Sequence, residues 1–210
     1  MKLYDFSLAP NPRRVRMFLA EKGIEVPLVQ VNTREREQFS DWFEKLNPSR
    51  TVPVLELDDG TIISESVAIC RYFEEIQPEP PLMGRDAKDK ATVEMWNRKA
   101  ELEGMAAVGD AARNSLPMFA DRATAGMPGG VPQIPALAER GRANFLRFLQ
   151  RLDDRLAESR FIAGEALTIA DITAFIAVEF SKRLEIEVPE RCANVSRWRD
   201  EIAARPSASA

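Results

Sequence analysis

The chain contains no histidine, which restricts the nucleophiles and metal sites that it can build. Ser-His and Cys-His nucleophile pairs are impossible, and so are the usual zinc sites that include histidine. Cys70 and Cys192 are the only cysteines and form no Cys-x-x-Cys pair, which argues against a thiolate metal site and a disulfide scaffold. Any activated nucleophile must therefore arise in another way, and we expect no bound metal.

Polar residues at two predicted helix starts could bind an anion without histidine. Asn11 precedes a helix predicted for Pro12–Gly23, and Ser66 follows Glu65 at the start of another. A helix start carries roughly half a positive charge and free N–H groups. Glu65 adds a carboxylate that can bind an ammonium group. The alternative at both places is a cap without a ligand, with Asn11 as the N-cap and Pro12 as the first helical residue.

The elements that must position these residues alternate in the first part of the chain. In order, the predicted strands and helices are Lys2–Phe6, Pro12–Gly23, Val26–Val31, a short helix around Trp42–Leu46, Val52–Leu57, Thr61–Ser64 and Ser66–Ile76. Asp58-Asp59-Gly60 supplies the turn of a hairpin between the last two strands. The predicted order is therefore βαβαββα.

Only helix and loop patterns follow a proline-rich segment after this first part. The predicted segments are Ala87–Arg122 as one long helix or a broken pair, the Gly/Pro-rich loop Thr124–Pro135, and helices at Ala136–Ala157, Ile169–Phe180 and Val195–Ala204. Asp86 suits a cap, and Thr168 with Asp171 forms a capping-box pattern. We predict an α/β domain at 1–78, a linker at 79–86 and an all-helical domain at 87–210.

Composition argues against several classes of function. The formal net charge is -4 over 210 residues, and lysine and arginine are scattered among the acidic residues, so we expect no nucleic-acid partner. The sequence shows no secretion signal and no apolar run of membrane-spanning length. We therefore predict a cytoplasmic protein without a membrane partner.

Three stretches of the chain resemble the cytosolic glutathione transferase family, and together they span nearly all of it. They are Pro10–Gly23, Asn47–Leu55 with Glu65–Ile69, and Leu167–Asp171 with Trp198-Arg199 and Ala204–Pro206 beyond it. The resemblance implies a thioredoxin-like N-terminal domain for glutathione, a helical domain for a small hydrophobic electrophile, and a homodimer. It predicts the nucleophilic addition of the glutathione thiolate to that electrophile.

The resemblance also implies which residues bind glutathione. A cis Val52-Pro53 peptide would turn the backbone groups of Val52 outward to pair with the cysteinyl backbone, whereas a trans proline would only open a strand. Glu65 and Ser66 would bind the γ-glutamyl ammonium and carboxylate. Asn11 and Arg14 complete the predicted glutathione site.

The hydroxyl or thiol that this family uses to activate glutathione is missing. Its place reads Ala9-Pro10-Asn11-Pro12. We therefore predict Asn11 as the catalytic group, with its carboxamide N–H donating to the sulfur, and Ser7 as the nearest hydroxyl, although the strand pattern can turn it away. Other groups left open are Tyr4, which lies further back in the strand, and Arg113 or Asn114-Ser115 of the long helix.

Two alternatives to conjugation stay open at this stage. Another glutathione-dependent enzyme, such as a dehalogenase, isomerase or peroxidase, would use the same thiolate, and the loop Thr124–Pro135 would distinguish it. A non-catalytic binding or regulatory protein would keep the fold alone. The missing hydroxyl favours that second alternative, whereas Val52-Pro53 and Glu65-Ser66 argue against it.

Overall fold

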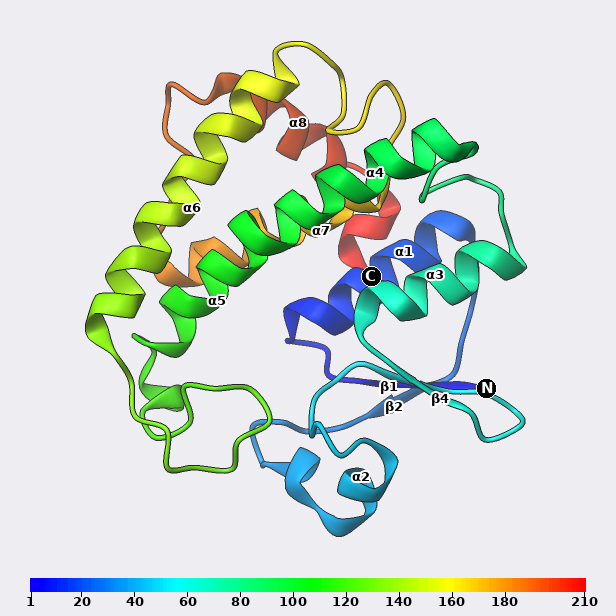
Figure 1. The fold of residues 1–210 in the computed structure, drawn as a ribbon, viewed down its shortest axis with the longest axis vertical. Helices are drawn as coiled ribbons and strands as arrows, with labels where there is room; N and C mark the ends of the chain where they lie inside the picture. Colours follow the sequence, from blue (N-terminus) through cyan, green and yellow to red (C-terminus); the bar gives the residue numbers. More distant parts are fainter.

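The N-terminal part of the computed structural model, which describes residues 1–210, is a four-stranded mixed sheet with the strand order β2-β1-β3-β4 (Figure 1). Strand β1 is parallel to β2 and antiparallel to β3, which pairs antiparallel with β4. Helices α1 and α3 pack together on one side of the sheet, and α2 lies on the other (Figure 1). The bounds are β1 Lys2–Asp5, α1 Pro10–Lys22, β2 Leu28–Gln30, the 3-10 turn η1 Glu37–Phe39, α2 Asp41–Leu46, β3 Val54–Glu56, β4 Ile62–Ser64 and α3 Ser66–Ile76. The predicted thioredoxin-like βαβαββα order is confirmed.

The rest of the chain is helical, as predicted. It contains α4 Ala87–Lys99, the π-helical segment η2 Ala100–Met105, α5 Ala106–Arg113, η3 Pro117–Phe119, α6 Pro135–Leu156, α7 Ile169–Ser181, η4 Lys182–Leu184, α8 Ala193–Ala203 and η5 Pro206–Ser209. The predicted helix 87–122 is thus one continuous helical segment that contains a π-helical turn, and it ends at Arg113 rather than Arg122. Pro117 explains this early end, because the residue before a proline is held in the extended conformation that Leu116 adopts. None of the helices has both the length and the apolar character needed to cross a membrane.

Helix α1 begins two residues earlier than predicted. Its N-cap is Ala9, its first residue is Pro10, and no side chain caps it. The interpretation of Asn11 as N-cap and Pro12 as first residue is therefore wrong. Pro10 fits the first position because the N–H that proline lacks would have no partner there. Gly23 ends the helix with φ 65°, a conformation that glycine adopts without strain.

The strands are shorter than their alternating patterns predicted. β2 covers three of the six residues predicted at Val26–Val31, and β3 begins only at Val54. The Val52-Pro53 peptide is cis, as the resemblance implied, and lies before the ladder of β3 with β1. Proline has no N–H for a ladder, so the segment leading into β3 leaves backbone groups outside the sheet.

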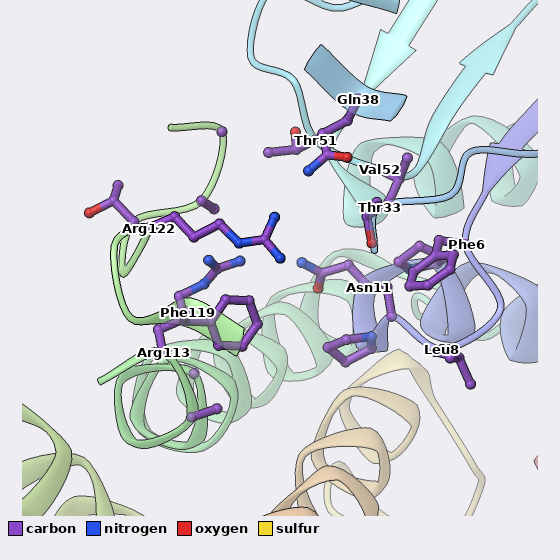
Figure 2. A pocket seen from close by; sticks show the side chains of 18 of the residues that line it. Phe6, Leu8, Asn11, Thr33, Gln38, Thr51, Val52, Arg113, Phe119 and Arg122 are labelled. Atoms are coloured by element: carbon purple, nitrogen blue, oxygen red, sulfur yellow. The ribbon is translucent and has the colours of Figure 1, made fainter. Parts of the chain in front are cut away.

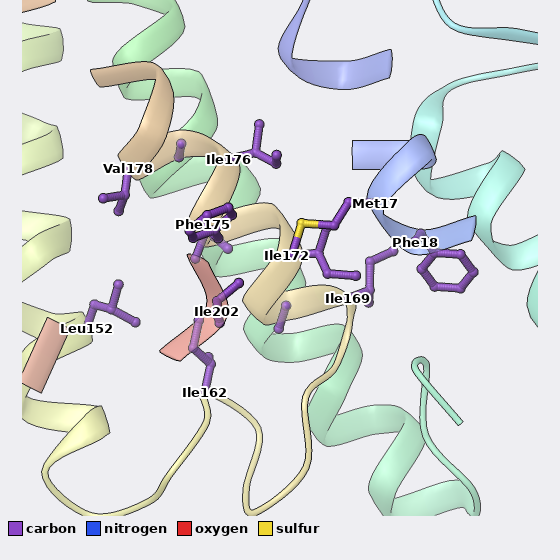
Figure 3. Close-up of a cluster of buried hydrophobic side chains, with 14 of the residues drawn as sticks. Met17, Phe18, Leu152, Ile162, Ile169, Ile172, Phe175, Ile176, Val178 and Ile202 are labelled. Carbon is purple, nitrogen blue, oxygen red and sulfur yellow. The ribbon is translucent and has the colours of Figure 1, made fainter. Parts of the chain in front are cut away.

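A continuous apolar core joins the two parts of the chain (Figure 3). Met17 and Phe18 of α1 belong to the same cluster of 39 buried residues as Ile169 and Ile172 of α7. The predicted core aromatics, Phe145, Phe148, Phe161 and Trp198, are all buried. The Thr168–Asp171 capping box is present, and the Asp171 carboxylate also accepts from the Ile162 N–H at 2.8 Å and the Trp198 indole N–H at 3.0 Å. Helix α7 therefore holds α1, and with it the start of α1, against the helical part.

Candidate active site

A cleft of about 700 Å³ opens between the sheet side and the helical side of the molecule (Figure 2). One wall contains the start of α1 with the loop before β3 and Glu65, and the other contains η2, α5 and the segment 116–127. This volume lies in the range of small-molecule sites. The cleft brings together Asn11, Arg14, Val52 and Glu65 from the predicted site, whereas Pro53, Ser66 and Ser7 are not among its lining residues.

Val52 presents unpaired backbone groups at the cleft. Neither its N–H nor its C=O has a hydrogen-bond partner within the chain, and the residue lines the cleft. Backbone donors and acceptors that lie outside the ladders of a sheet can pair with an extended peptide, as those of an edge strand do. The geometry therefore suits a strand-like ligand at this position.

Glu65 and Ser66 form the start of α3. Glu65 lines the cleft, is exposed, and makes no ion pair or side-chain hydrogen bond within the chain. Its backbone has φ 71°, which is uncommon for a residue other than glycine. Residues in such conformations are found more often at functional sites than elsewhere. The first N–H groups of α3 have no helical partners. A free carboxylate beside a helix N-terminus can bind an ammonium and a carboxylate of the same ligand.

Asn11 extends from the first turn of α1 into the cleft (Figure 2). Its side-chain oxygen accepts from Arg14 Nη2 at 3.2 Å, which leaves the amide N–H groups of the same side chain for a ligand. Pro10 and Pro12 have no N–H, and the Arg13 N–H donates to the Ala9 carbonyl at 3.2 Å. The Asn11 N–H is thus the free backbone donor of this helix turn.

Arg14 lines the cleft, but the protein itself occupies its guanidinium. Nε and Nη2 donate to the Ser66 hydroxyl oxygen at 3.2 and 2.6 Å. Nη1 donates to Glu101 at 3.0 Å and to Thr173 at 3.2 Å, and Nη2 also donates to Asn11. These bonds account for the five N–H groups of the side chain, which is almost fully buried. Arg14 therefore positions Asn11 and Ser66, and the Ser66 hydroxyl proton stays available for a ligand.

Most of the other candidate groups lie outside the cleft lining, namely Ser7, Tyr4, Asn114 and Ser115. Ser7 lies in the exposed turn after β1, where its N–H donates to the Gln30 side chain and its carbonyl accepts from Arg16. The Tyr4 hydroxyl donates to Glu56 at 2.7 Å. Asn114 uses both ends of its amide within the chain, and the Ser115 hydroxyl donates to the Ala111 carbonyl. Among the helical candidates, Arg113 lines the cleft.

Gln38 is a polar residue of the cleft that sequence reasoning missed. It is 8% exposed, and its side-chain oxygen is buried without a hydrogen-bond partner. It lies near Thr51 and Val52 (Figure 2). A buried acceptor oxygen without a partner indicates a place where a donor of a ligand can bind. No local pattern marks Gln38, because its burial depends on the packing of η1 against the loop before β3.

The segment after η3 closes one end of the cleft against the sheet side. Gly126 has φ 74° and lies so close to the Ser49 carbonyl that a Cβ atom at this position would overlap it. Arg36 donates to the Pro128 carbonyl across the same boundary. Thr124 and Met127 from this segment line the cleft. The loop predicted at Thr124–Pro135 therefore helps to shape the site.

Comparison with known proteins matches the two halves of the chain to two family models. Residues 9–76 match the model described as Glutathione S-transferase, N-terminal domain, and residues 116–206 match the C-terminal domain of the same family. Glutathione S-transferase 2 of Saccharomyces cerevisiae is 34% identical over 99% of this chain and 87% of its own length.

Two solved structures have similar folds. A glutathione S-transferase domain-containing protein of Marinobacter aquaeolei VT8 has a TM-score of 0.89 and 37% identity, with 99% of both chains covered. A glutathione S-transferase of class Gtt2 from Vibrio parahaemolyticus has a TM-score of 0.83 and 38% identity, with 99% of this chain and 94% of the other covered.

Proposed function

The chain belongs to the glutathione S-transferase family and is a glutathione transferase, and on that premise we propose how this cleft binds glutathione and promotes its reaction. The observation that carries the proposal is Glu65, a carboxylate without a partner in the chain that faces the same cleft as the open backbone of Val52. Glutathione is an extended, dipolar tripeptide, and these two features match its backbone and its γ-glutamyl end.

Each part of glutathione has a proposed partner on the sheet side. The cysteinyl backbone pairs with the N–H and C=O of Val52 beside Pro53. Glu65 binds the γ-glutamyl ammonium of glutathione. The γ-glutamyl carboxylate lies at the start of α3, where it accepts hydrogen bonds from the Ser66 hydroxyl and the free N–H groups of the helix. The unpartnered side-chain oxygen of Gln38 accepts from the glycyl N–H. Arg14 acts by holding Ser66 and Asn11 in place rather than by touching glutathione.

Asn11 is the proposed donor to the glutathione sulfur. Its side-chain amide and its backbone N–H both lie at the start of α1, where the helix dipole favours a negative charge. Stabilising the thiolate lowers the pKa of the bound thiol, as it does for cysteines at helix starts. We assign Ser7 no part in this step, because it lies in the exposed turn after β1, where its backbone N–H and C=O bond to Gln30 and Arg16.

In the proposed reaction the thiolate adds to a hydrophobic electrophile held by the helical side of the cleft. Met105, Leu116, Met118 and Phe119 supply an apolar surface there, and methionine side chains adapt to varied ligands. The sulfur forms a bond to an electrophilic carbon, the π bond of that carbon breaks, its electron pair moves to the neighbouring atom and takes up a proton from solvent, and the thiol proton leaves to solvent. Dehalogenation, isomerisation and peroxide reduction would begin from the same thiolate.

The binding site is tested with Glu65→Gln and a matched control, Glu139→Gln, in which the same change is made at an exposed glutamate outside the cleft. Titration calorimetry with glutathione should show at least a tenfold weaker affinity for the first variant and an unchanged affinity for the second, about 1.4 kcal/mol of lost ammonium binding. Equal affinities of both variants would contradict the assignment.

The thiolate proposal is tested by the ultraviolet absorbance of bound glutathione as a function of pH. A thiol pKa well below the ~8.5 of a free cysteine supports it, and Asn11→Ala should move that pKa upward. An unshifted pKa in the wild-type complex would contradict activation by this site.

We also propose a homodimer. Ile76 on α3, Met95 on α4 and Leu102 in η2 are large apolar side chains that are 54%, 45% and 62% exposed. A second copy of the chain would cover them. Light scattering should show a dimer for the wild type and a monomer for Leu102→Glu, and a monomeric wild type would refute the proposal. The cytoplasmic location stays a prediction.

A further inference from the structure

Two arginines of the helical side face the cleft without a carboxylate partner. Arg113 ends α5 and its guanidinium makes no hydrogen bond or ion pair within the chain, although the side chain is only partly exposed. Arg122 donates through Nε to the Met118 carbonyl at 3.0 Å and makes no ion pair. Both guanidinium groups lie by the Phe119 ring, with their central carbons 4.9 and 5.8 Å from its centroid (Figure 2).

The charge of the cleft is opposite to that of the whole chain, which is -4. Its lining includes the arginines 14, 34, 50, 113, 122 and 183, but the acidic residues 65 and 101 alone. Arg14 is paired with Glu101 and Arg50 with Glu44. Burial, together with the positive charge of Arg122, lowers the pKa of Arg113. Two neighbouring cations without a counter-ion are unfavourable, and a bound anion would relieve this.

Glutathione leaves this pair of arginines free. Its charged ends have partners on the opposite wall, where Glu65 and the start of α3 suit the γ-glutamyl group and Arg34, which makes no ion pair within the chain, suits the glycyl carboxylate. Arg113 and Arg122 instead share the helical wall with the apolar residues Leu116, Met118 and Phe119. The anion they suit therefore belongs to the second substrate.

We propose that the electrophile of this enzyme carries a carboxylate, which binds Arg113 and Arg122 while its apolar body packs on Phe119. The inference rests on the proposed function, since it specifies the substrate class for the same cleft. A guanidinium fork matches a carboxylate in geometry and donates charge-assisted hydrogen bonds. Phe119 holds both guanidinium groups on one side of the cleft through cation–π contacts.

The test uses two electrophiles of nearly the same shape, the anionic 4-chloro-3-nitrobenzoate and the neutral 4-chloro-3-nitrobenzamide. In both, the glutathione sulfur forms a bond to the chlorine-bearing ring carbon, chloride leaves with the electrons of the C–Cl bond, and the thiol proton goes to solvent. The enzyme-catalysed kcat/KM for each compound is divided by its uncatalysed rate constant, which removes the intrinsic difference in reactivity. The corrected acid-to-amide ratio is the readout.

We expect the wild-type ratio to favour the acid, and we expect Arg113→Met and Arg122→Met each to lower the ratio about tenfold or more. Arg113→Lys keeps the charge and should recover part of it. The control is Arg147→Met, which removes an exposed arginine of α6 that lies outside the cleft. Far-ultraviolet circular dichroism verifies the fold of each variant, and Arg122→Met tests the idea independently if Arg113→Met is unfolded.

The outcomes separate this inference from the proposed function. A wild-type enzyme that binds glutathione but shows no preference for the acid overturns the inference alone. The same is true if the variants slow the acid and the amide equally, because the arginines would then act on the sulfur or on the fold. A wild-type protein that does not bind glutathione overturns the proposed function, and the inference with it.

Discussion

Arg14 offers a direct test of how the site is built, because one side chain connects α1, α3, η2 and α7. The informative change is Arg14→Met, which keeps an unbranched apolar side chain in the space but removes the guanidinium. Ser66 and Asn11 then lose the donors that orient them, and Glu101 loses a partner at 3.0 Å. The variant should lose both stability and glutathione affinity.

The expected loss of stability follows from the groups left behind. Removing one partner of a fully buried ion pair costs 3–5 kcal/mol. Glu101 is 19% exposed and keeps Arg98 at 2.8 Å, so its share falls to about 2 kcal/mol. The oxygens of Ser66 and Thr173 lose hydrogen bonds of about 1 kcal/mol each. The total is about 4 kcal/mol, or roughly 10 °C in the midpoint of thermal unfolding for a chain of this size.

The assay combines thermal or urea unfolding with glutathione titration calorimetry. Glutathione affinity should fall about tenfold, as expected for one charge-assisted hydrogen bond lost through misplacement of Ser66 or Asn11. Glu65→Gln is the comparison, because its exposed carboxylate should affect affinity without changing stability. The stability and glutathione affinity of Arg14→Lys should lie between those of the wild type and Arg14→Met, since a single ammonium group reaches fewer partners than a guanidinium group. If Arg14→Met stays within about 1 kcal/mol of the wild type and binds glutathione equally well, the positioning role is refuted.

Three further predictions concern other buried groups. Asp171→Ala should reduce the unfolding free energy by about 3 kcal/mol or more in urea titrations, because the N–H groups of Ile162, Thr168 and Trp198 lose a buried acceptor; a loss below about 1 kcal/mol would contradict this. Burial raises the pKa of Glu21, but hydrogen bonds from Arg205 and Ser207 outweigh the effect of burial and hold the pKa below its ordinary value. The ionised Glu21 therefore stabilises the folded protein at pH values above the ordinary glutamate pKa. This stabilisation is lost as the pH falls. The stability difference between wild type and Glu21→Gln should therefore shrink between about pH 6 and about pH 3, and a constant difference would argue against it. Burial raises the pKa of Cys70 to about 12, so a disulfide reagent should label this thiol much faster in denaturant than in the native protein, and equal rates would show that the site is open.

Local chemistry was enough to predict most of the fold. Thr168 with Asp171 and Asp86 before α4 follow capping rules that depend on a few neighbouring residues, and each has the predicted role. The predicted start of α1 was wrong because Pro10 and Pro12 are both acceptable in the first turn of a helix. The preference for asparagine at the N-cap and proline after it then favours a helix that starts at Pro12. This local preference does not include the contacts of Arg14 with distant elements.

The candidate site was predictable in its backbone features and less so in its side chains. Val52 and Glu65 line the cleft where the resemblance implied. The hydrogen bonds of Arg14 and the burial of Gln38 arise between segments far apart in the sequence, so no local spacing indicates them. The unpaired state of Arg113 and Arg122 could not be read from the sequence either, because it depends on where every carboxylate lies after folding.

The core that runs from Met17 and Phe18 into Ile169 and Ile172 has a consequence for how this chain can change over generations. A replacement that enlarges one side of this layer must be matched on the other side, about 150 residues away, or the packing is lost. A chimera that joins residues 1–78 to the helical half of a relative would inherit an unmatched layer and should fold poorly until both sides are repacked together. Substitutions in the cores of the two halves must therefore occur together, even though each half has a recognisable sequence signature of its own.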